Sequence, residues 1–595
     1  MKKWISMILC VMLILGTVAC GNGGKQGNSR GKVQLTFWAV INENNQSLMK
    51  QIVDEFNETN ENYFVKLVPK TSGYSASLGG TLKGQNPPNI VQIDDRYFKG
   101  YVDEKYLTNL EQFFEDVKGQ NGETRKASTL DLDGVLDTAI ERYRYDAETG
   151  YAGGDSPLYA MPAGLAPGVM YYNATAMKDG GVNIISIPEE EVASYNAENG
   201  TNYLAKAFEI YDTAPEKELT AKDGKYYVYN NQIPMSWEEL IEVASLFTKS
   251  YNPSSPTTYG FFNEWWFTFG WGVGGDCLEW DEEQEQYVMA LGDEVKNYLV
   301  TGADGVSING KSYKEGQILS YADKNYVNKV MNDSSHAEYA QISAYISNQN
   351  LYELPSMRDA FQLFLQLSQS KNKNVTDKAM GLEISPTPSI IGNKSKTNLL
   401  TSNEVMFVVE GYTACNGLGK AMDTLKKEWD VAPLYQYREY ADNGELKKVN
   451  GTSVVGELST HSTSLGYAIP ENSKSKEGSW EFIEYMSSPK VQETLMKANA
   501  YVPIWESLLN GESLAKCTSE YSPKNMNALA MLTKCSSIGD WSYLEDGEWV
   551  SVWSNTLNTD VRNGEMTLDE FFNDECISKT NELLGTSYFS KKYSD

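Results

Sequence analysis

Three strand-like segments open the body of the chain, and a helical stretch follows the first. Residues 33–39 alternate apolar and polar side chains, which is typical of a half-buried strand. Apolar residues over 48–56 then recur at helical spacing, while residues 63–69 and 90–93 give two further strands. This β-α-β rhythm predicts parallel or mixed sheets with helices on their faces, so we expect an α/β fold.

Polar residues lie where the first and third of these strands end. The first strand runs into the loop WAVINENN, from Trp38 to Asn45, and the third ends on Asp94-Asp95-Arg96. In sheets of this kind, ligands bind outside the carboxyl ends of the strands. We therefore expect the two loops to face one binding site.

The length of the chain requires more than one folding unit. It has 595 residues, against the roughly 100–200 of a single domain, so two or more lobes are expected. Pro and Gly interrupt residues 156–177 repeatedly, which suggests a crossing between lobes. The polar, irregular stretches 183–231 and 280–350 look like insertions, and residues 301–313 suggest a small hairpin within the second of them.

The first residues indicate export. Lys2 and Lys3 precede a short apolar run and small residues that end on Cys20, which is the pattern of a secretory signal. The stretch GTVAC looks like a bacterial lipobox, in which the Cys is acylated, although Thr17 stands where an aliphatic residue is usual. The alternative is an ordinary signal with an incidental Cys. Gly21–Gly31 then reads as a flexible tether for a body held at the outer face of a bacterial membrane, with a Gram-positive cell the expected source.

Charge and cysteine content exclude several classes of protein. The formal net charge of -29 argues against nucleic acid and anionic lipid and favours a neutral or cationic ligand. Once Cys10 and Cys20 are set aside, the remaining cysteines are odd in number and widely spaced, which argues against a disulfide framework, with Cys517 and Cys535 one possible pair. With two histidines and no CxxC, no zinc site is expected, and neither metal nor cofactor is predicted.

Six segments in order resemble one known family. The chain is similar to the extracellular solute-binding lipoproteins of carbohydrate ABC importers, the maltose-binding-protein-like group (family 1 solute-binding proteins). Beyond the lipobox, the resemblance rests on LTFWAVINENNQ, NPPNIVQIDDRYF, LYAMPAGLAPGVMYYNATAM, IPMSWEELIEVASLF, VMFVVEGYTACNGL and GYAIPENSKSKEGSWEFIEYM. Together these segments span most of residues 33–503, with the polar insertions outside the match.

The resemblance implies a periplasmic-binding-protein-like fold of type II, with mixed sheets flanked by helices and a ligand cleft between two lobes. Mapped onto this sequence, it divides the chain into a signal peptide at 1–19, a lipid anchor and tether at 20–31, lobe 1 at 32–162, lobe 2 at 163–437, a return to lobe 1 at 438–510, and a C-terminal part of lobe 2 at 511–595.

The resemblance also implies where a sugar would be held. Aromatic rings bury the flat C–H faces of a sugar, while carboxylates, amides and guanidinium groups bond its hydroxyl rim. Tyr412 stands where the family usually stacks a Trp on a sugar ring, and Cys20 would carry the lipid. The full set of expected ligand contacts is Trp38, Asn42, Glu43, Asp95, Arg96, Gly164, Trp265, Trp266, Glu410, Tyr412 and Trp541.

Several of these residues also have a purely structural interpretation. Trp38 can be core, and Glu43 with its Asn neighbours can be a helix N-cap region. Asp95 can cap a helix and pair with Arg96 at the surface. The aromatic segment EWWFTFGW can be a buried cluster, although we expect at least one of its Trp residues in the cleft.

The predicted function is capture of a sugar or oligosaccharide and its delivery to the permease of an ABC transporter, by a monomer that binds and closes without catalysis. A lipid-anchored glycoside hydrolase is the alternative, because Asp and Glu are plentiful and such enzymes need two carboxylates. The serine elbow, P-loop and HExxH motifs are absent from the sequence.

Overall fold

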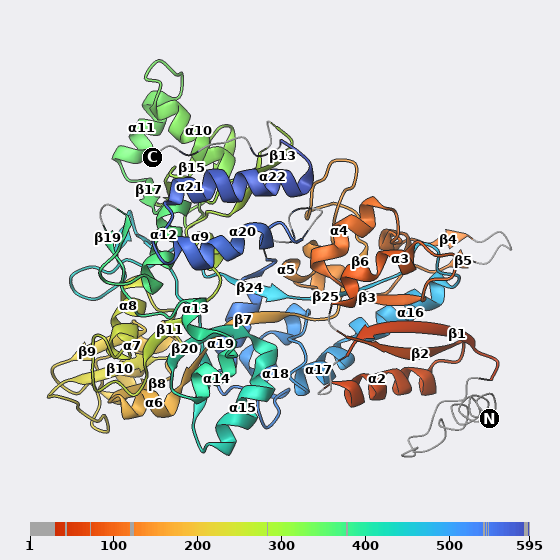
Figure 1. The fold of residues 1–595 in the computed structure, drawn as a ribbon, viewed down its shortest axis with the longest axis horizontal. Coiled ribbons are helices and arrows are strands. Elements are labelled where there is room, and N and C mark those ends of the chain that lie inside the picture. Colours follow the sequence, from red (N-terminus) through yellow and green to blue (C-terminus); the bar gives the residue numbers. More distant parts are fainter. Residues whose placement is uncertain are drawn as a thin grey trace, which may run out of the picture.

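The protein is described by a computed structural model, in which the chain forms two lobes side by side (Figure 1). The structure describes residues 30–41, 45–71, 73–118, 124–281, 284–376, 379–539, 542, 544, 547–587, 589 and 593. The predicted signal peptide and Cys20 lie outside these residues. Within the described residues, no helix combines the length and apolar character needed to cross a membrane.

Lobe 1 is built on a mixed sheet of five strands. Their order is β2 (Tyr63–Lys70), β1 (Val33–Val40), β3 (Ile90–Asp94), β25 (Leu465–Ala468) and β6 (Ala160–Pro162). β1 pairs in parallel with β2 and β3, whereas β25 runs antiparallel to β3 and β6. The strands predicted at 33–39, 63–69 and 90–93 are therefore confirmed, and so is the mixed character of the sheet.

Helices from both ends of the chain cover the sheet of lobe 1. Phe37 on β1 meets Phe482 on α16 (Lys476–Ser487) with ring centroids 5.2 Å apart, and Phe56 on α2 (Gln46–Thr59) meets the same ring at 5.0 Å. α17 (Pro489–Lys497) follows α16 directly. On the chain between β3 and β6 lie α4 (Asp95–Asp103) and α5 (Asp137–Ile140).

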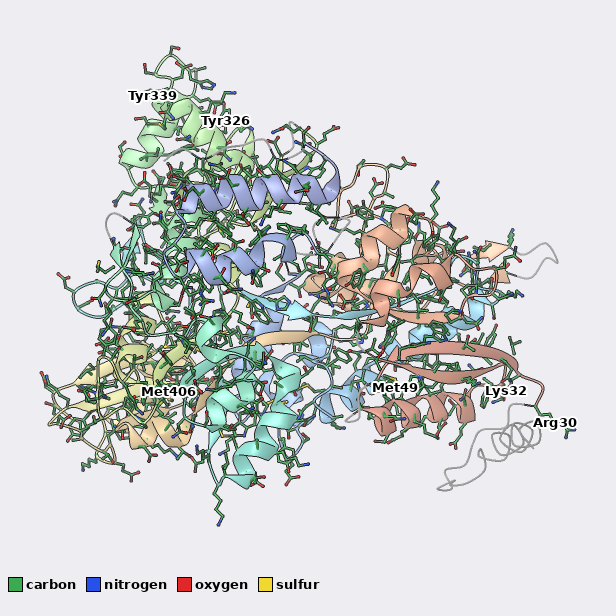
Figure 2. All side chains as sticks on the ribbon, in the orientation of Figure 1. Arg30, Lys32, Met49, Tyr326, Tyr339 and Met406 are labelled. Carbon is green, nitrogen blue, oxygen red and sulfur yellow. The ribbon has the colours of Figure 1, made fainter. Side chains whose placement is uncertain are left out.

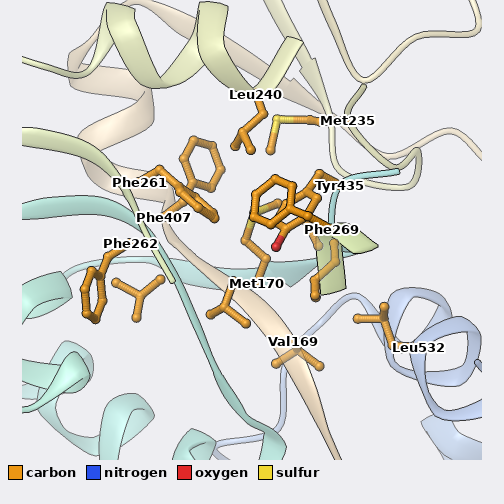
Figure 3. Packing of buried hydrophobic residues seen from close by; sticks show 14 of the residues in the cluster. Val169, Met170, Met235, Leu240, Phe261, Phe262, Phe269, Phe407, Tyr435 and Leu532 are labelled. Carbon is orange, nitrogen blue, oxygen red and sulfur yellow. The ribbon is translucent and has the colours of Figure 1, made fainter. Parts of the chain in front are cut away.

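Lobe 2 is built on a second mixed sheet. The strand order is β11 (Tyr259–Phe262), β20 (Val405–Gly411), β7 (Ala166–Asn173), β24 (Thr460–Thr463) and β26 (Ser536–Ser537), with β21 (Trp429–Ala432) also paired to β7. Met170 on β7, Phe407 on β20 and Tyr435 lie in its core beside Phe261 and Phe269 (Figure 3). The helices of this lobe include α6 (Ala174–Asp179), α8 (Trp237–Leu246), α9 (Phe267–Trp271), α12 (Met357–Ser368), α14 (Lys396–Thr401), α15 (Cys415–Thr424), α19 (Met526–Lys534), α20 (Ser551–Thr556) and α22 (Ser578–Leu584).

Both predicted insertions are folded and belong to lobe 2. The first forms a small sheet of β8 (Val182–Ile185), β10 (Tyr226–Asn230) and β9 (Phe208–Tyr211). The second has its own core under α10 (Tyr321–Met331) and α11 (Tyr339–Ser347), where Figure 2 labels Tyr326 and Tyr339. The hairpin predicted at 301–313 is confirmed as β15 (Val306–Ile308) and β16 (Lys311–Tyr313), turning at Asn309 and Gly310 with positive φ.

Three segments cross between the lobes and are tied together. The first runs from β6 to β7 around Gly164, whose carbonyl accepts a hydrogen bond from Ser464 Oγ at 2.9 Å. The second runs from β24 to β25 through Ser464, and the third contributes Val502, which exchanges backbone hydrogen bonds with Leu165 at 2.7 and 2.9 Å. The predicted crossing at residues 156–177 is confirmed.

The second crossing lies further along the chain than expected. The sequence places the return to lobe 1 at residue 438, but β24 still pairs with β7 of lobe 2, and only β25 joins the sheet of lobe 1. Arg438 pairs with Glu189 of the first insertion, and Thr452 Oγ1 donates a hydrogen bond to Glu315 of the second at 2.7 Å. Residues 438–463 therefore pack on lobe 2, because the insertions supply their partners.

The disulfide weighed for Cys517 and Cys535 is not formed. Both are free thiols, as are Cys415 and Cys576. All but Cys535 are buried. These residues therefore act as small core side chains.

Candidate functional site

Two cavities lie between the lobes. The first chamber has a volume of about 560 Å³ and the second chamber about 770 Å³. Both fall within the roughly 300–1,000 Å³ of ligand pockets in general. The first chamber is lined by Val40, Asn45, Asp94, Asp95, Arg96, Ala166, Trp265, Thr413, Asn416, His461, Thr463, Ser464, Leu465, Ala498, Asn499, Ala500 and Tyr501.

The carboxyl ends of β1 and β3 supply the lobe 1 wall of the first chamber. Asp94 is the N-cap of α4, and its carboxylate accepts a hydrogen bond from the backbone N–H of Arg96 at 3.1 Å. The Arg96 guanidinium returns to the same carboxylate through Nε at 2.9 Å and Nη2 at 2.8 Å. This two-pronged pair holds a half-exposed guanidinium at the chamber wall and raises the pKa of Arg96.

Asp95 faces inward rather than toward Arg96. Its carboxylate receives Arg142 Nη1 at 3.1 Å, and both side chains are buried. Arg142 also donates to the carbonyl and the hydroxyl of Ser462 on β24, at 3.0 and 2.9 Å. Burial raises the pKa of Asp95, while the Arg142 charge opposes that rise. The pair thus fastens lobe 1 to a strand of lobe 2 behind the chamber.

Trp265 is the aromatic residue that lobe 2 contributes to the first chamber. Its ring is half-buried, and its backbone N–H donates to Asn263 Oδ1 at 3.0 Å, which fixes the loop after β11. Lys396 Nζ lies 4.6 Å from the ring centroid and pairs with Glu264 at 2.8 Å and Glu410 at 3.5 Å. A cation at this distance adds attraction to the ring and keeps it in place.

Asparagines form the floor of the first chamber beside the third crossing. Asn499 Nδ2 donates to Asn416 Oδ1 at 2.8 Å, and both residues line the cavity. Tyr412 lies behind them with no exposed surface and donates its hydroxyl proton to Asn499 Oδ1 at 2.7 Å. The floor therefore presents amide groups, which both donate and accept hydrogen bonds.

His461 lies where the first chamber meets the crossings. Its ring is 2 % exposed and meets the Trp265 ring edge-on, with centroids 4.5 Å apart. Burial, and next the charges of Arg142 and Lys396, lower its pKa to about 3. The imidazole is therefore neutral at physiological pH.

The chemistry of the first chamber is that of a binding site for a polar, neutral molecule. It offers a carboxylate, a guanidinium and amides beside one aromatic face. Over the described residues, no group of three or more His, Cys, Asp or Glu side chains is placed to hold a metal ion.

Comparison with known families decides which kind of protein this is. The family model described as bacterial extracellular solute-binding protein matches residues 51–519. The chain belongs to the bacterial extracellular solute-binding proteins. No curated protein matches it.

Solved structures with this fold include several binding proteins. An ABC substrate-binding protein from Listeria monocytogenes, in complex with cycloalternan, has 13% identity and a TM-score of 0.52, over 93% of this chain and 100% of that one. The GacH receptor of Streptomyces glaucescens, solved with and without acarbose, has 14% identity and a TM-score of 0.51, over 94% and 99%. The cyclic α-maltosyl-1,6-maltose binding protein of Arthrobacter globiformis has 12% identity and a TM-score of 0.51, over 93% and 99%. These likenesses show the two-lobe fold.

Three of the predicted contacts of this solute-binding protein line its first chamber: Asp95, Arg96 and Trp265. Their pairing differs from the expected one, because Arg96 pairs with Asp94 and Asp95 with Arg142. Asn42, Glu43 and Trp541 lie outside the described residues.

The other five predicted contacts lie away from the walls of the first chamber. Trp38 is half-buried against the lobe 1 core under Lys70, and Glu410 pairs with Lys396. Trp266 packs against the ring of Trp553, and Gly164 lies against Tyr501. Tyr412 lies behind Asn499. For these five, ligand contact stays a prediction that the geometry does not favour.

In and directly behind the first chamber lie further residues that are not among the predicted contacts. Asp94 belongs to the Asp94-Asp95-Arg96 run at the end of the third predicted strand. His461 is one of only two histidines, and this rarity is a sequence signal that could have marked it as a candidate. Arg142 and Asn499 sit in segments of ordinary composition and reach the site only through the chain crossings. Local sequence therefore gives no sign of them.

Proposed function

We propose that this solute-binding protein captures a carbohydrate in the first chamber and delivers it to the permease of an ABC transporter. The observation that carries the proposal is the placing of Trp265 on one lobe opposite the Asp94–Arg96 pair on the other. A ring face and a charged hydrogen-bonding group on facing walls match the two surfaces of a sugar.

Both walls come from one chain, so the unit that binds is a monomer that closes around its ligand by hinge motion. Two of the similar structures hold cycloalternan or acarbose, and the third protein binds cyclic α-maltosyl-1,6-maltose, which supports an oligosaccharide as the ligand class. The chamber volume of about 560 Å³ also suits a ligand larger than one sugar ring.

Binding without catalysis is the form of the proposal that the chamber favours. Among the described residues that line it, the carboxylates are Asp94 and Asp95, consecutive residues at the end of one strand. Glycoside hydrolysis needs two carboxylates that flank the scissile bond. Two neighbours fixed by Arg96 and Arg142 are poorly placed to flank a sugar.

A panel of neutral oligosaccharides, followed by intrinsic tryptophan fluorescence, tests the proposal. We expect saturable binding in the wild type, a loss of at least about tenfold in affinity for Trp265→Ala, and little change for Trp38→Ala, the matched control outside the chamber. Binding that depends on Trp38 and ignores Trp265 would overturn the assignment of the chamber. Release of shorter sugars after incubation would support the hydrolase instead.

The proposal includes attachment to the outer face of the bacterial cell membrane through a lipid on Cys20, with Gly21–Gly31 as the tether. Cys20→Ser should then move the protein from the membrane fraction to the medium, while ligand affinity stays unchanged. Mass spectrometry of the mature amino terminus gives the decisive reading, because an unmodified Cys20 contradicts the anchor.

A further inference from the structure

The orientation of the Trp265 ring in the first chamber is set by packing. The hydrogen bonds of this residue use its backbone, which donates to Asn263 Oδ1 at 3.0 Å and accepts from Asn263 Nδ2 at 3.1 Å. Its indole N–H donates to no other described residue. The backbone bonds fix the loop but leave the side-chain torsions of Trp265 free. The groups that pack against the ring therefore decide which rotamer it adopts.

Three neighbours pack against that ring. The His461 ring meets it edge-on with centroids 4.5 Å apart, and the Phe267 ring lies nearly parallel to it at 6.0 Å. The third neighbour is a cation, because Lys396 Nζ lies 4.6 Å from the ring centroid. An ammonium group within about 6 Å of an indole centroid is attracted to the face of the ring, and more strongly where water is excluded. Lys396 is therefore the neighbour that attracts the ring by its charge.

The position of Lys396 is itself fixed by acidic side chains. Its side chain is 11% exposed, and a buried cation is stable only when it is paired. Nζ lies 2.8 Å from Glu264, in the loop that carries Trp265, and 3.5 Å from Glu410, at the end of β20. Glu410 is in turn held by the backbone N–H of Gly411, which donates to its Oε1 at 2.9 Å. The ammonium group is thus placed by a loop, a strand end and the start of α14.

Lys396 reaches a molecule in the first chamber only through the ring. The described residues that line this chamber include Trp265 but not Lys396. Without the ammonium group, the ring loses its charged contact and is free to adopt other rotamers. A ligand then has to immobilise the ring when it binds, and ordering a side chain at an interface lowers affinity. Loss of Lys396 should therefore weaken binding although the residue touches no ligand.

We propose that Lys396 is a positioning residue for the ligand of the first chamber. Its ammonium group, held by Glu264 and Glu410, fixes Trp265 in the orientation that receives the face of a sugar. The inference rests on the proposed function, in which Trp265 is the stacking surface, and it adds a residue outside the chamber wall on which the affinity depends. Glu410 then acts on the ligand through Lys396 rather than by contact.

Fluorine NMR of the protein labelled with 5-fluorotryptophan, together with titration calorimetry, tests the proposal. The Trp265 line is identified by its absence in Trp265→Phe, and the probes are neutral oligosaccharides, with maltotriose, cellotriose and xylotriose among them. In Lys396→Met, which removes the charge and keeps a side chain of similar length, the Trp265 line should broaden or split, and affinity should fall about fivefold. Lys396→Arg keeps a cation over the ring, so it should retain a single line and an affinity within about twofold of the wild type.

Lys70→Met is the matched control, because Lys70 Nζ lies 3.3 Å from the centroid of the Trp38 ring, outside the first chamber. This variant shows what removal of a charge alone does to an indole line, and it should leave both the Trp265 line and the affinity unchanged. The thermal unfolding midpoint of Lys396→Met should fall by no more than about 2 °C, because Glu264 and Glu410 are partly exposed and can be hydrated.

The outcomes separate this inference from the proposed function. A single, unbroadened Trp265 line in Lys396→Met, an unchanged affinity in that variant, or a loss of affinity that Lys396→Arg shares would each overturn the inference, while sugar binding in the first chamber still stands. If the wild type binds none of the oligosaccharides, the proposed function fails. A Trp265 line that splits in Lys396→Met and stays single in Lys396→Arg then still upholds the positioning of the ring by Lys396.

Discussion

His461 shows how burial at the crossings sets the charge of the candidate site. In the folded protein its pKa is lowered to about 3, against about 6.5 in an unfolded chain. Between about pH 6.5 and pH 3, His461 is therefore protonated in the unfolded chain but neutral in the folded protein. Its contribution to the free energy of unfolding is consequently lost as the pH falls from about 6.5 toward 3. Above about pH 6.5 this penalty disappears.

We expect His461→Gln to remove that part of the pH dependence. Between about pH 7 and pH 5, the wild-type protein should lose about 2 kcal/mol more of its free energy of unfolding than the variant. Urea denaturation at the two pH values measures the difference, and comparison within the pair cancels the contributions of the many carboxylates. Equal losses in the two proteins would mean that the folded state protonates His461 easily.

Gly164 is required by the close approach of two crossings. Its φ is +149°, and a Cβ there would lie 2.3 Å from the Cβ of Tyr501. Gly164→Ala should therefore lower the free energy of unfolding by about 3 kcal/mol. Gly411→Ala is the control, because Gly411 has φ of -60° and nothing within 4 Å of its added Cβ, so urea denaturation should show a change below about 1 kcal/mol. Equal effects at the two positions would contradict this reading of the crossing.

At the scale of elements, a buried ion pair holds α10 to the strands before it within the second insertion. Lys324 on α10 contacts Asp293 after β13 (Gln286–Met289), with Nζ 3.1 Å from Oδ2. The same Nζ donates to Asn297 Oδ1 on β14 (Asn297–Val300) at 2.9 Å. Both charged side chains are at most 2% exposed. Lys324→Met leaves the Asp293 carboxylate buried without its cation, so we expect a loss of about 3–5 kcal/mol in the free energy of unfolding.

The double variant Lys324→Met with Asp293→Asn removes both charges, and it should recover most of that loss. The exposed pair Lys178–Glu428 is the control, since Lys178→Met should cost less than about 1 kcal/mol. Urea denaturation of the wild type, Lys324→Met, the double variant and Lys178→Met measures the four free energies of unfolding. If the double variant is as unstable as Lys324→Met, the loss comes from packing of α10 rather than from the stranded charge.

How far the sequence predicts each element depends on whether its signal is local. The alternation over 33–39 and the apolar run 90–93 predict β1 and β3, because the period of the apolar residues and the length of each strand are visible within a few consecutive residues. Asn309-Gly310 predicts its hairpin for the same reason. The partner of Asp95 could not be predicted, because Arg142 meets it only after the chain has folded back.

The candidate site is predicted from three different signals. Arg96 is predicted because it follows a strand end, Trp265 because it lies in the aromatic segment EWWFTFGW, and Tyr412 because the resembling family has a Trp at that position. In this chain the Tyr412 ring is wholly buried and positions Asn499 instead. An aromatic motif predicts a ring in the region, but its exposure is decided by packing.

At the scale of the whole molecule, three crossings tied by hydrogen bonds join two separate cores. Lobe 1 packs around β1 and β3, and lobe 2 around β7 and β20, with chambers on either side of the Asp95–Arg142 pair. Such an arrangement lets the lobes move as rigid bodies about the crossings. The second insertion adds the hairpin of β12 (Leu278–Asp281) and β13 to the wall of one chamber.

The central claim is that the first chamber binds a neutral carbohydrate and leaves it intact, and titration calorimetry with an oligosaccharide panel tests it most directly. The account predicts a saturable heat of binding for the wild type that is weakened at least about tenfold in Trp265→Ala. A continuing heat after each injection, which signals turnover, or binding that is unaffected by Trp265→Ala, would contradict it.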